Sequence, residues 1–257
     1  MAYALITGAS KGIGKEIAAE LAKRNYDLLL VARSESLLAE VAKELSTTYN
    51  VKADYLSVDL AGVDVAQQVI DWTTQKGYEV SILVNNAGYG LVGPFDSYSI
   101  TQNRDMLNLN IATLTEMCHH FLPMLKRQPK AYIMNIASST AYQALPLMAA
   151  YAASKIYVLN FSRGLKLELK KTSVSVTCIS PGATSTNFND RANLQEKARK
   201  AAAKVTMTPQ DVAKQSVEAM FAGKAEFVPG LVNKLGKFLA WIAPKAITES
   251  VAMGIYE

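Results

Sequence analysis

The 257-residue sequence contains few of the residues that form disulfide frameworks or metal sites. It has two cysteines, Cys118 and Cys178, and two histidines, His119 and His120. The cysteines form no CxxC pair, so we interpret both as buried, small apolar residues of a protein from a reducing compartment. The histidines stand among apolar residues of a predicted helix, without a third ligand at suitable spacing. Packing is therefore the favoured interpretation, and no metal site is expected.

Long apolar runs and a strong excess of one charge are also missing. No stretch of 18 uninterrupted apolar residues occurs, so a membrane-spanning helix is not expected. The N-terminus lacks the basic and apolar regions of a secretory signal. The net charge is +5, and the basic residues are scattered, which argues against nucleic-acid binding. With 50% hydrophobic and 19% charged residues, the composition predicts a globular cytoplasmic protein.

The sequence does contain a regular alternation of apolar runs and amphipathic stretches. The predicted strands are residues 3–6, 27–32, 54–58, 81–84, 131–136 and 174–179. The predicted helices are residues 13–23, 35–46, 63–75, 102–126, 151–170 and 209–222. Uninterrupted apolar strands that alternate with helices are typical of a parallel sheet covered on both faces. Since no Gly-, Ser- or Pro-rich linker divides the chain, we predict one doubly wound α/β domain over residues 1–257.

A glycine-rich segment separates the first predicted strand from the first predicted helix. Glycines permit a tight turn and close backbone approach, and a helix N-terminus favours phosphate. The spacing GxxxGxG differs from GxGxxG, and a sharp strand-to-helix turn alone would also explain it. Its place at the opening of the first βα unit favours a dinucleotide site. The candidate residues are Gly8, Ser10, Lys11, Gly12, Ile13 and Gly14.

The end of the second predicted strand indicates which dinucleotide to expect. An acid at this point bonds the ribose 2′-OH of NAD, whereas an arginine accommodates the 2′-phosphate of NADP. This chain has Arg33 and no acid there, and Lys11 and Ser10 could complete the phosphate pocket. The sequence therefore predicts NADP(H), with a solvated loop residue as the alternative for Arg33. Asp59, after the third predicted strand, is a candidate for the adenine edge, with a helix N-cap or turn residue as the alternative.

Four separated motifs resemble those of the short-chain dehydrogenase/reductase family, in the same order. They are residues 7–14, Asn85-Asn86-Ala87-Gly88, Tyr151-Ala152-Ala153-Ser154-Lys155 and Pro181-Gly182. The resemblance runs from Leu5 to about Ala222 and implies a single Rossmann-type domain with a seven-stranded parallel sheet. The C-terminal part, with Phe227-Val228-Pro229-Gly230, is similar to a bacterial branch that includes 3-oxoacyl reductases and 17β-hydroxysteroid dehydrogenases.

The resemblance also implies roles for individual residues. Tyr151 matches the proton-transfer tyrosine, Lys155 the lysine of the YxxxK motif, Ser138 the serine thirteen positions earlier, and Asn110 the asparagine of the active-site tetrad. All four positions are intact, which implies an active enzyme. The cofactor-side positions are Asn86, Gly88, Tyr151, Lys155, Pro181, Gly182 and Thr186, the last at the carboxamide end.

The chemistry explains why such a tetrad is useful. Hydride attack on a carbonyl builds charge on its oxygen, and a free tyrosine with a pKa near 10 exchanges protons poorly at neutral pH. Lys155, one helical turn from Tyr151, is expected to lower that pKa. Ser138 is expected to hold the substrate oxygen, and Asn110 to anchor a water that relays protons to Lys155. Ser139 competes with Ser138, and strand alternation would send the two side chains to opposite sides.

The segment at residues 184–206 is predicted to close over the substrate. Its basic residues suggest an acidic acyl-thioester carrier, and a solvated amphipathic lid helix is the favoured alternative. Tyr89, Tyr142, Leu145 and Met148 are predicted to line an apolar pocket for a medium or large hydrophobic ketone.

A further apolar segment, residues 228–243, has helical spacing with Lys234 and Lys237 on its polar side. It is a candidate membrane-interface helix, dimer contact or pocket cover. Two lysines are too few for firm membrane binding, which favours packing onto the protein or a partner subunit. By resemblance, the long helices at 102–126 and 152–170 are dimer faces of a homodimer or homotetramer.

Three functional hypotheses follow. The leading one is an NADPH-dependent reductase that converts a carbonyl to an alcohol on a hydrophobic or acyl-type substrate. Its rival among enzymes is an NAD(P)-linked alcohol or hydroxysteroid dehydrogenase that works oxidatively, and Arg33 argues against NAD. The rival of another class is a regulator that senses NADP(H) without turnover, which the intact tetrad disfavours.

Overall fold

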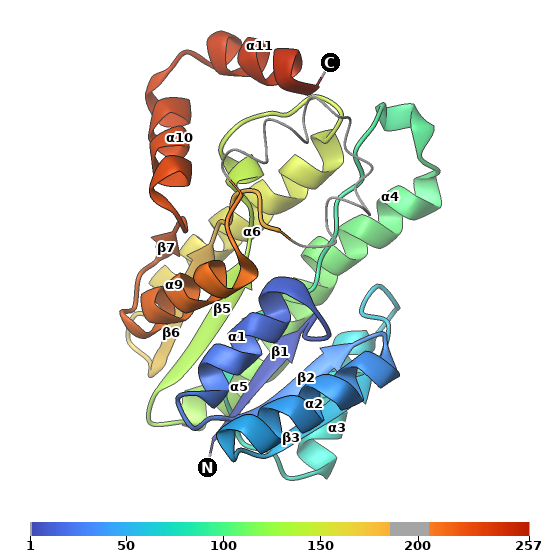
Figure 1. Cartoon of the computed structure of the whole chain (residues 1–257), viewed down its shortest axis with the longest axis vertical. Helices are drawn as coiled ribbons and strands as arrows, with labels where there is room; N and C mark the ends of the chain where they lie inside the picture. The colour runs from blue at the N-terminus through green and yellow to red at the C-terminus, as the bar shows by residue number, and fades with distance from the viewer. Residues whose placement is uncertain (1, 186–205, 257) are drawn as a thin grey trace.

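A single parallel sheet forms the centre of the molecule (Figure 1). The computed structural model describes residues 2–185 and 206–256, and within them the sheet has seven strands in the order β3-β2-β1-β4-β5-β6-β7. The strands are β1 (Tyr3–Thr7), β2 (Asp27–Ala32), β3 (Ala53–Ser57), β4 (Val80–Asn85), β5 (Ala131–Ile136), β6 (Val174–Ile179) and β7 (Glu226–Phe227). Every pairing between neighbouring strands is parallel. The predicted fold class is confirmed.

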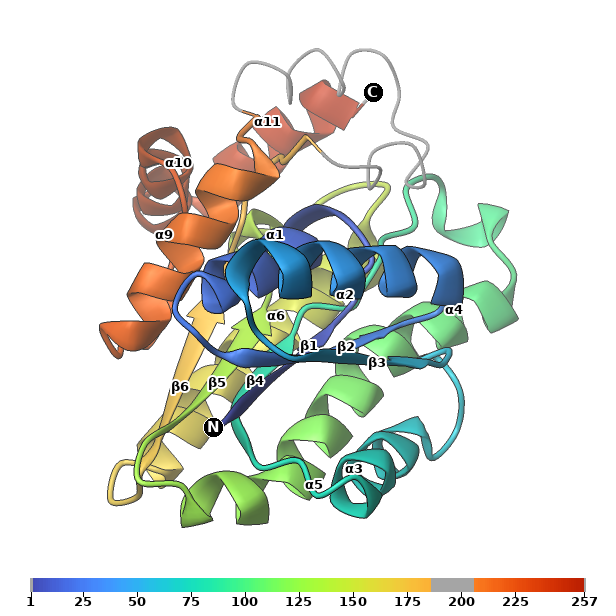
Figure 2. The ribbon, with the colours of Figure 1, turned by 60° about the horizontal axis from the view of Figure 1, so that its bottom comes forward.

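Helices cover both faces of this sheet (Figure 2). One face carries α1 (Gly12–Ala22), α2 (Glu35–Tyr49) and α9 (Pro209–Phe221). The other carries α3 (Val65–Gln75), α5 (Leu114–Arg127) and α6 (Ala149–Glu168), with α4 (Ile100–Leu107) beside α6. All residues of β2, β4 and β5 are buried. This two-sided burial explains why these strands are continuous apolar runs rather than alternating ones.

The strand order reverses at β1, and this reversal determines where a ligand can bind. β1 pairs with β2 on one side and with β4 on the other. The chain leaves β1 towards α1 on one face and leaves β4 towards the helices of the other face. In sheets of this kind a crevice opens outside the carboxyl ends of the strands at the point of reversal. The glycine-rich segment after β1 and Asn86 after β4 meet there.

Two elements differ from the sequence prediction. The predicted helix at 102–126 is divided, because the π-helical segment η2 (Asn108–Thr113) separates α4 from α5. A π turn is a rare, single-turn bulge inside an α-helix, and the helical spacing of the flanking residues alone led to the prediction of one continuous helix. The strand β7 has only two residues, Glu226 and Phe227, which is too short to produce a pattern.

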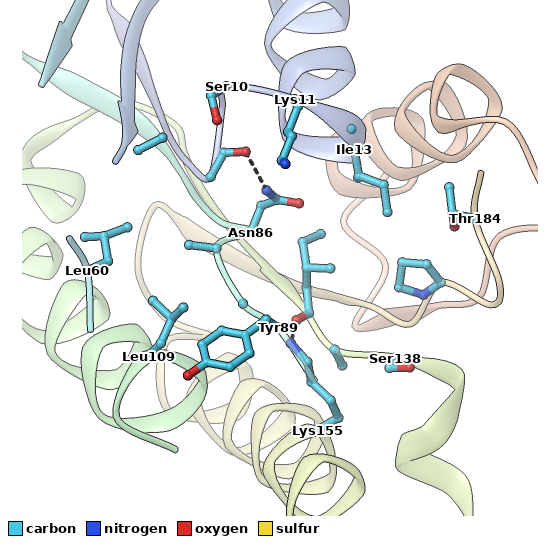
Figure 3. Close-up of a pocket in the computed structure, with 18 of the residues that line it drawn as sticks. Ser10, Lys11, Ile13, Leu60, Asn86, Tyr89, Leu109, Ser138, Lys155 and Thr184 are labelled. Carbon is cyan, nitrogen blue, oxygen red and sulfur yellow. Dashed lines mark hydrogen bonds between the residues drawn. The ribbon is translucent and has the colours of Figure 1, made fainter. Parts of the chain in front are cut away.

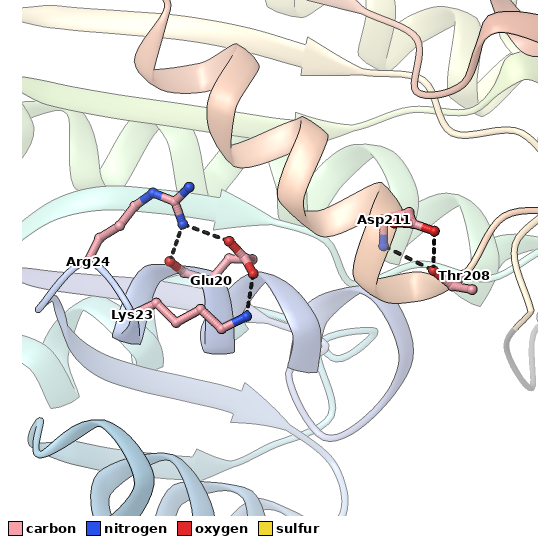
Figure 4. A network of polar contacts seen from close by, with 5 residues as sticks. All are labelled: Glu20, Lys23, Arg24, Thr208 and Asp211. Carbon is pink, nitrogen blue, oxygen red and sulfur yellow. Dashed lines mark hydrogen bonds and ion pairs between the residues drawn. The ribbon is translucent and has the colours of Figure 1, made fainter.

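Polar contacts fix the ends of the packed pair α1 and α9 (Figure 4). Thr208 Oγ1 accepts a hydrogen bond from Asp211 N at 3.1 Å and caps α9, with Asp211 in the first turn. In α1, Glu20 pairs with Lys23 at 2.6 Å and with Arg24 at 2.7 Å. Burial alone raises the pKa of Glu20, but the hydrogen bonds from Lys23 and Arg24 outweigh it and hold that pKa below its usual value.

The chain continues after β7 into α10 (Leu231–Ile242) and α11 (Lys245–Tyr256). Figure 1 shows both helices standing apart from the layers that cover the sheet. The predicted helix at 228–243 thus corresponds to α10. Among the residues that the structure describes, no helix combines the length and the apolar character needed to cross a membrane.

Candidate active site

A cleft of about 490 Å³ lies at the carboxyl ends of the strands and brings most of the predicted site residues together. Those in its wall are Gly8, Ser10, Lys11, Gly12, Ile13, Arg33, Asp59, Asn86, Gly88, Ser138, Tyr151, Lys155, Pro181 and Gly182. Figure 3 shows how the glycine loop, Asn86 and the Ser138–Lys155 side surround one space. Gly14 and Asn110 lie behind the wall. Thr186 and most of the predicted lid at 184–206 fall outside the described residues.

The glycine loop requires its glycines for two different reasons. Gly8 and Gly12 have φ angles of +67° and +59°, which side chains rarely tolerate. Gly14 is needed for close packing, since a Cβ there would lie 2.4 Å from the carbonyl oxygen of Gly8. Asn86 closes the loop by donating from Nδ2 to the carbonyl oxygens of Thr7 at 2.9 Å and Gly8 at 3.3 Å. Thr7, for which no role was predicted, also supports the loop, because its Oγ1 accepts from the backbone N–H of Asn86 at 2.9 Å.

The first turn of α1 is open to an anion. Gly12 and Ile13 begin the helix and line the cleft. Within the described residues the Lys11 side chain, at the N-cap, makes no capping hydrogen bond. The first N–H groups of a helix have no partner inside it, and its dipole favours negative charge. These residues therefore fit the pyrophosphate of a dinucleotide.

Arg33 and Asp59 lie at the other end of the cleft. Arg33 Nη1 is 3.9 Å from Asp59 Oδ2, and the two side chains are 56% and 59% exposed. A pair of this length and exposure contributes little free energy, so the guanidinium is available to a ligand. Asp59 Oδ1 also accepts from Ala61 N at 3.1 Å, which is the turn role foreseen as its alternative.

Lys155 and Tyr151 occupy successive turns of α6. Lys155 is 4% exposed, and its Nζ lies 5.8 Å from the centre of the Tyr151 ring. The same Nζ donates to the carbonyl oxygen of Ile136 at 3.0 Å, at the end of β5. Burial lowers the pKa of Lys155 to about 8, because the charged ammonium loses its hydration.

Ser138 follows β5 rather than belonging to it. The strand ends at Ile136, and Ser138 caps the short helix η3 (Ser139–Tyr142) by accepting from Thr140 N at 3.2 Å. Ser138 and Ser139 both line the cleft. Strand alternation therefore does not decide between the two serines, because β5 ends at Ile136, before both of them.

Asn110 is 1% exposed and is positioned by the π-helical segment η2. Its Nδ2 donates to the Tyr89 carbonyl at 3.0 Å and to Ser154 Oγ at 3.1 Å, and its Oδ1 accepts from Tyr89 N at 3.2 Å. Gly88 is needed for close packing here, since a Cβ at Gly88 would lie 2.9 Å from Asn110 Oδ1 and 3.3 Å from Lys155 Nζ. Sequence reasoning missed Ser154, although its place between Tyr151 and Lys155 on a buried helix face was a usable signal.

Residues 2–197 match a family model described as short chain dehydrogenase. This chain belongs to the short-chain dehydrogenase family. The match covers the glycine loop, the Asn86 segment and the Tyr151–Lys155 pair, whose geometry is described above.

Named relatives and solved structures agree with this membership. The very-long-chain 3-oxoacyl-CoA reductase-A of Danio rerio is 34% identical over 183 residues, which span 70% of this chain and only 57% of that protein. The 7beta-hydroxysteroid dehydrogenase of Clostridium sardiniense is 29% identical over 232 residues, 90% of this chain and 87% of that one. A short-chain dehydrogenase from Sphingobium yanoikuyae, solved in complex with NADPH, has a TM-score of 0.82 and 26% identity, and covers 96% of this chain and 98% of its own.

This short-chain dehydrogenase has an apolar side to its cleft. Met148, Tyr89 and Leu109 line it, as predicted for the first two. Leu145 packs in the buried cluster behind Met148. Tyr142 has a different role, because its hydroxyl donates to Glu226 Oε1 at 2.6 Å, and its predicted place in the pocket was wrong.

Proposed function

We propose that this protein is an NADP(H)-dependent reductase that converts a carbonyl on a hydrophobic or acyl-type substrate to an alcohol. One observation carries the proposal. Ser138, Tyr151 and Lys155 line the same cleft as the glycine loop and Arg33. The cleft is therefore bordered by a loop suited to phosphate, by the Arg33 cation for a further phosphate, and by the proton-transfer pair Tyr151 and Lys155.

The glycine loop and the first turn of α1 would hold the pyrophosphate, and Arg33 the 2′-phosphate. Asp59 is proposed at the adenine edge, and Asn86, Gly88, Pro181 and Gly182 along the path of the cofactor. When bound, the nicotinamide supplies the hydride.

Tyr151 is the proposed proton donor to the carbonyl oxygen. The Lys155 ammonium, close to the tyrosine ring, favours the phenolate that remains after the transfer. Ser138 would donate a hydrogen bond to the same oxygen and stabilise the charge that builds there. Asn110 would keep this side in place through the Tyr89 backbone and Ser154, and it is the proposed anchor of a water that relays protons to Lys155.

The substrate class is proposed from the apolar side of the cleft and from the relatives. Met148, Tyr89 and Leu109 offer apolar contacts that suit an acyl chain or a steroid. One relative is named a 3-oxoacyl-CoA reductase and another a hydroxysteroid dehydrogenase. The second name supports an alternative, the oxidation of a hydroxysteroid at the same site. Comparing turnover of 3-oxoacyl thioesters with turnover of keto- and hydroxysteroids would distinguish the two.

Tyr151→Phe tests the proposed chemistry. Loss of the phenolic proton should reduce NADPH-dependent carbonyl reduction by about 10²-fold or more, since proton transfer by a side chain contributes roughly 10²–10⁴-fold. NADPH affinity, measured by fluorescence titration, should change less than about threefold because the nucleotide-binding loop is untouched.

Tyr157→Phe is the matched control. Tyr157 lies on the same helix, is 38% exposed, and its hydroxyl is 3.0 Å from Thr115 Oγ1. It should retain activity within about twofold of the wild type. Full turnover by Tyr151→Phe would overturn the proposed role. NADPH binding without turnover across thioesters, steroids, quinones and aldehydes would favour the sensing regulator instead.

A further inference from the structure

The helix α10 contacts the protein through its polar side. Asn233 and Lys237 on this side are partly covered, whereas Leu231 is 82% and Trp241 77% exposed. A surface helix normally buries its apolar side and leaves its polar side in water. The apolar side thus does not hold α10 against the protein, so polar contacts have to explain its position beside the sheet layers (Figure 1).

Three side chains from different elements form a cluster at this contact. Glu226 is the first residue of the edge strand β7, and its side chain is 14% exposed. Lys237 Nζ, from α10, forms an ion pair with Glu226 Oε1. The Tyr142 hydroxyl, at the end of η3, donates to the same oxygen at 2.6 Å. Lys237 Nζ also lies 5.1 Å from the centre of the Tyr142 ring. The Glu226 cluster, made up of these three side chains, thus joins η3, β7 and α10.

The charges of the Glu226 cluster strengthen the bond to Tyr142. Burial alone raises the pKa of Glu226, but the hydrogen bonds from Lys237 and Tyr142 outweigh it and hold that pKa below its usual value. Burial and the bond to Glu226 raise the pKa of Tyr142. Near neutral pH the phenol is therefore the donor and the carboxylate the acceptor. Such charge-assisted bonds are roughly twice as strong as neutral ones, so the Tyr142 hydroxyl is firmly held.

The bond at Tyr142 also restrains the residue at the start of η3. This helix is a single turn of four residues, Ser139–Tyr142, and Ser138 is its N-cap. Ser138 accepts from Thr140 N through Oγ at 3.2 Å and from Ala141 N through its carbonyl oxygen at 3.0 Å. A single 3₁₀ turn has few hydrogen bonds of its own and depends on its surroundings. Fixing its last residue, Tyr142, therefore restricts the movement of Ser138.

A second contact of α10 reaches the neighbouring part of the cleft wall. Gly182 lines the cleft, and a Cβ there would lie 2.3 Å from Asn233 Oδ1 of α10. Asn233 is itself held by its Nδ2, which donates to the Pro229 carbonyl at 2.9 Å. Ser139 N donates to the carbonyl oxygen of Pro181 at 2.8 Å, which joins η3 to this stretch of the wall. The polar side of α10 thus lies behind the part of the wall that contains Ser138.

We propose that Glu226 is a positioning residue of the active site: through the Tyr142 hydroxyl it holds η3, and thereby the Ser138 hydroxyl, at the place where the substrate oxygen binds. The inference rests on the proposed function, which gives Ser138 its role. In the described part of the chain, the cleft wall includes none of the three side chains of the Glu226 cluster. Their effect on turnover should therefore pass through Ser138. A misplacement of ~1 Å can cost roughly 10²-fold in rate, so even a partial release of η3 should be measurable.

A double-mutant cycle tests this route. Tyr142→Phe keeps the ring and removes only the hydroxyl that Glu226 holds. It should lower kcat for NADPH-dependent carbonyl reduction by about tenfold, and the dissociation constant of NADPH should change less than about twofold because the glycine loop and Arg33 are untouched. In a Ser138→Ala background the same substitution should cost less than about twofold, since residues that act as one unit are not additive. Equal losses in the two backgrounds would overturn the proposal, because a general loss of packing would act without Ser138.

Tyr78→Phe is the matched control. The Tyr78 hydroxyl donates to Asp54 Oδ2 at the same distance, 2.6 Å, and Tyr78 lies just before β4, at the end of the sheet opposite to the cleft. The variant should keep kcat within about twofold of the wild type, because the same kind of bond is lost far from the reacting atoms. A loss of kcat as large as that of Tyr142→Phe would show that such bonds act through the stability of the whole fold, and it would overturn the proposal.

Two substitutions test Glu226 itself. Glu226→Gln keeps an oxygen that accepts from Tyr142, and Glu226→Leu does not. Relative to the wild type, kcat should stay within about threefold in Glu226→Gln and fall about tenfold in Glu226→Leu, since only the second leaves the Tyr142 hydroxyl without its acceptor. If both variants turn over as fast as the wild type, Glu226 does not position Ser138.

Amide hydrogen exchange tests the same restraint without any turnover. In the nucleotide-free Tyr142→Phe variant, the amides of Thr140 and Ala141, which donate to Ser138, should exchange about tenfold faster than in the wild type, because η3 opens more often. The amides of β3 should exchange as before. Unchanged exchange in η3 would overturn the proposal even if no substrate is found. A wild type that reduces no carbonyl would instead contradict the proposed function, and the exchange result would still decide whether the Glu226 cluster holds Ser138.

Discussion

At the scale of single residues, the burial of Lys155 should make the stability of the fold depend on pH. Its amine is buried, and its pKa falls from 10.5 to about 8 because the ammonium is removed from water. Below pH 8 the lysine is charged in the native and the unfolded chain, and its burial destabilises the native state. Between about pH 8 and 10.5 the unfolded chain holds a proton that the native chain has released. In this window the contribution of Lys155 to stability rises with pH.

Lys155→Met removes the titrating group and nearly preserves its shape. In the nucleotide-free protein, the difference in unfolding free energy between wild type and Lys155→Met should shift in favour of the wild type by roughly 3 kcal/mol from pH 7.5 to pH 10.5. Urea unfolding at several pH values measures it. Lys214→Met, exposed on α9, controls for the loss of a positive charge. A difference that does not change with pH would show that the native amine titrates normally.

The residues that could be predicted from the sequence are those at the ends of strands. Arg33, Asp59 and Ser138 follow apolar runs closely, and parallel strands bring such positions to one edge. The contacts that fix them could not be predicted. Thr7 binds the backbone of a residue 79 positions away, and Asn110 bonds Ser154 44 positions away. Local patterns contain no information on which distant polar groups will meet.

At the scale of elements, α9 shows how much a single cap is expected to contribute. Thr208 Oγ1 accepts from Asp211 N and donates to Asp211 Oδ2 at 2.7 Å (Figure 4). Thr208→Ala removes the side-chain oxygen that accepts from Asp211 N, and this N–H has no other acceptor within the helix. The variant should lose about 1 kcal/mol of stability, which lowers the melting temperature by roughly 2–4 °C in a chain of this size.

Ser34→Ala gives a control at the same position of another helix. Ser34 occupies the N-cap of α2, where in the described part of the chain its side chain makes no capping hydrogen bond. Its substitution should change the melting temperature by less than about 1 °C, since no cap is removed. If differential scanning calorimetry shows the same change in melting temperature for both substitutions, the capping hydrogen bond of Thr208 contributes no stability of its own.

Elements with long and strong patterns were predicted well. The bounds of β2 and β5 agree with the apolar runs at 27–32 and 131–136, because every residue of these strands is buried. The division of α4 from α5 and the strand β7 were missed, for the reasons of periodicity and length given above. The orientation of α10 was missed as well. Helical spacing identifies an apolar side, but the contacts of Lys237 with Glu226 decide which side faces the protein.

At the scale of the whole molecule, the alternation of strands and helices was sufficient to predict the doubly wound sheet and therefore the location of the cleft. The cleft draws on the loop after β1, the end of β2, the segment after β4 and the residues after β5 and β6. A ligand that touches all of these parts binds the native chain and has no site on the unfolded one. Its binding free energy is thus added to the stability of the entire fold.

This linkage allows the proposed role of Arg33 to be tested without any substrate. NADPH at about 100 times its dissociation constant should stabilise the wild type by roughly 2.7 kcal/mol, and NADH at the same concentration should raise the melting temperature less. In Arg33→Asp the guanidinium that is proposed to pair with the 2′-phosphate is replaced by an acid that suits a free 2′-hydroxyl, so the order of the two cofactors should reverse. Arg127→Asp, exposed at the end of α5, should keep the wild-type order. A preference for NADPH that is unchanged in Arg33→Asp would remove Arg33 from the cofactor site, and because turnover is not measured, this outcome would leave the proposed role of Tyr151 intact.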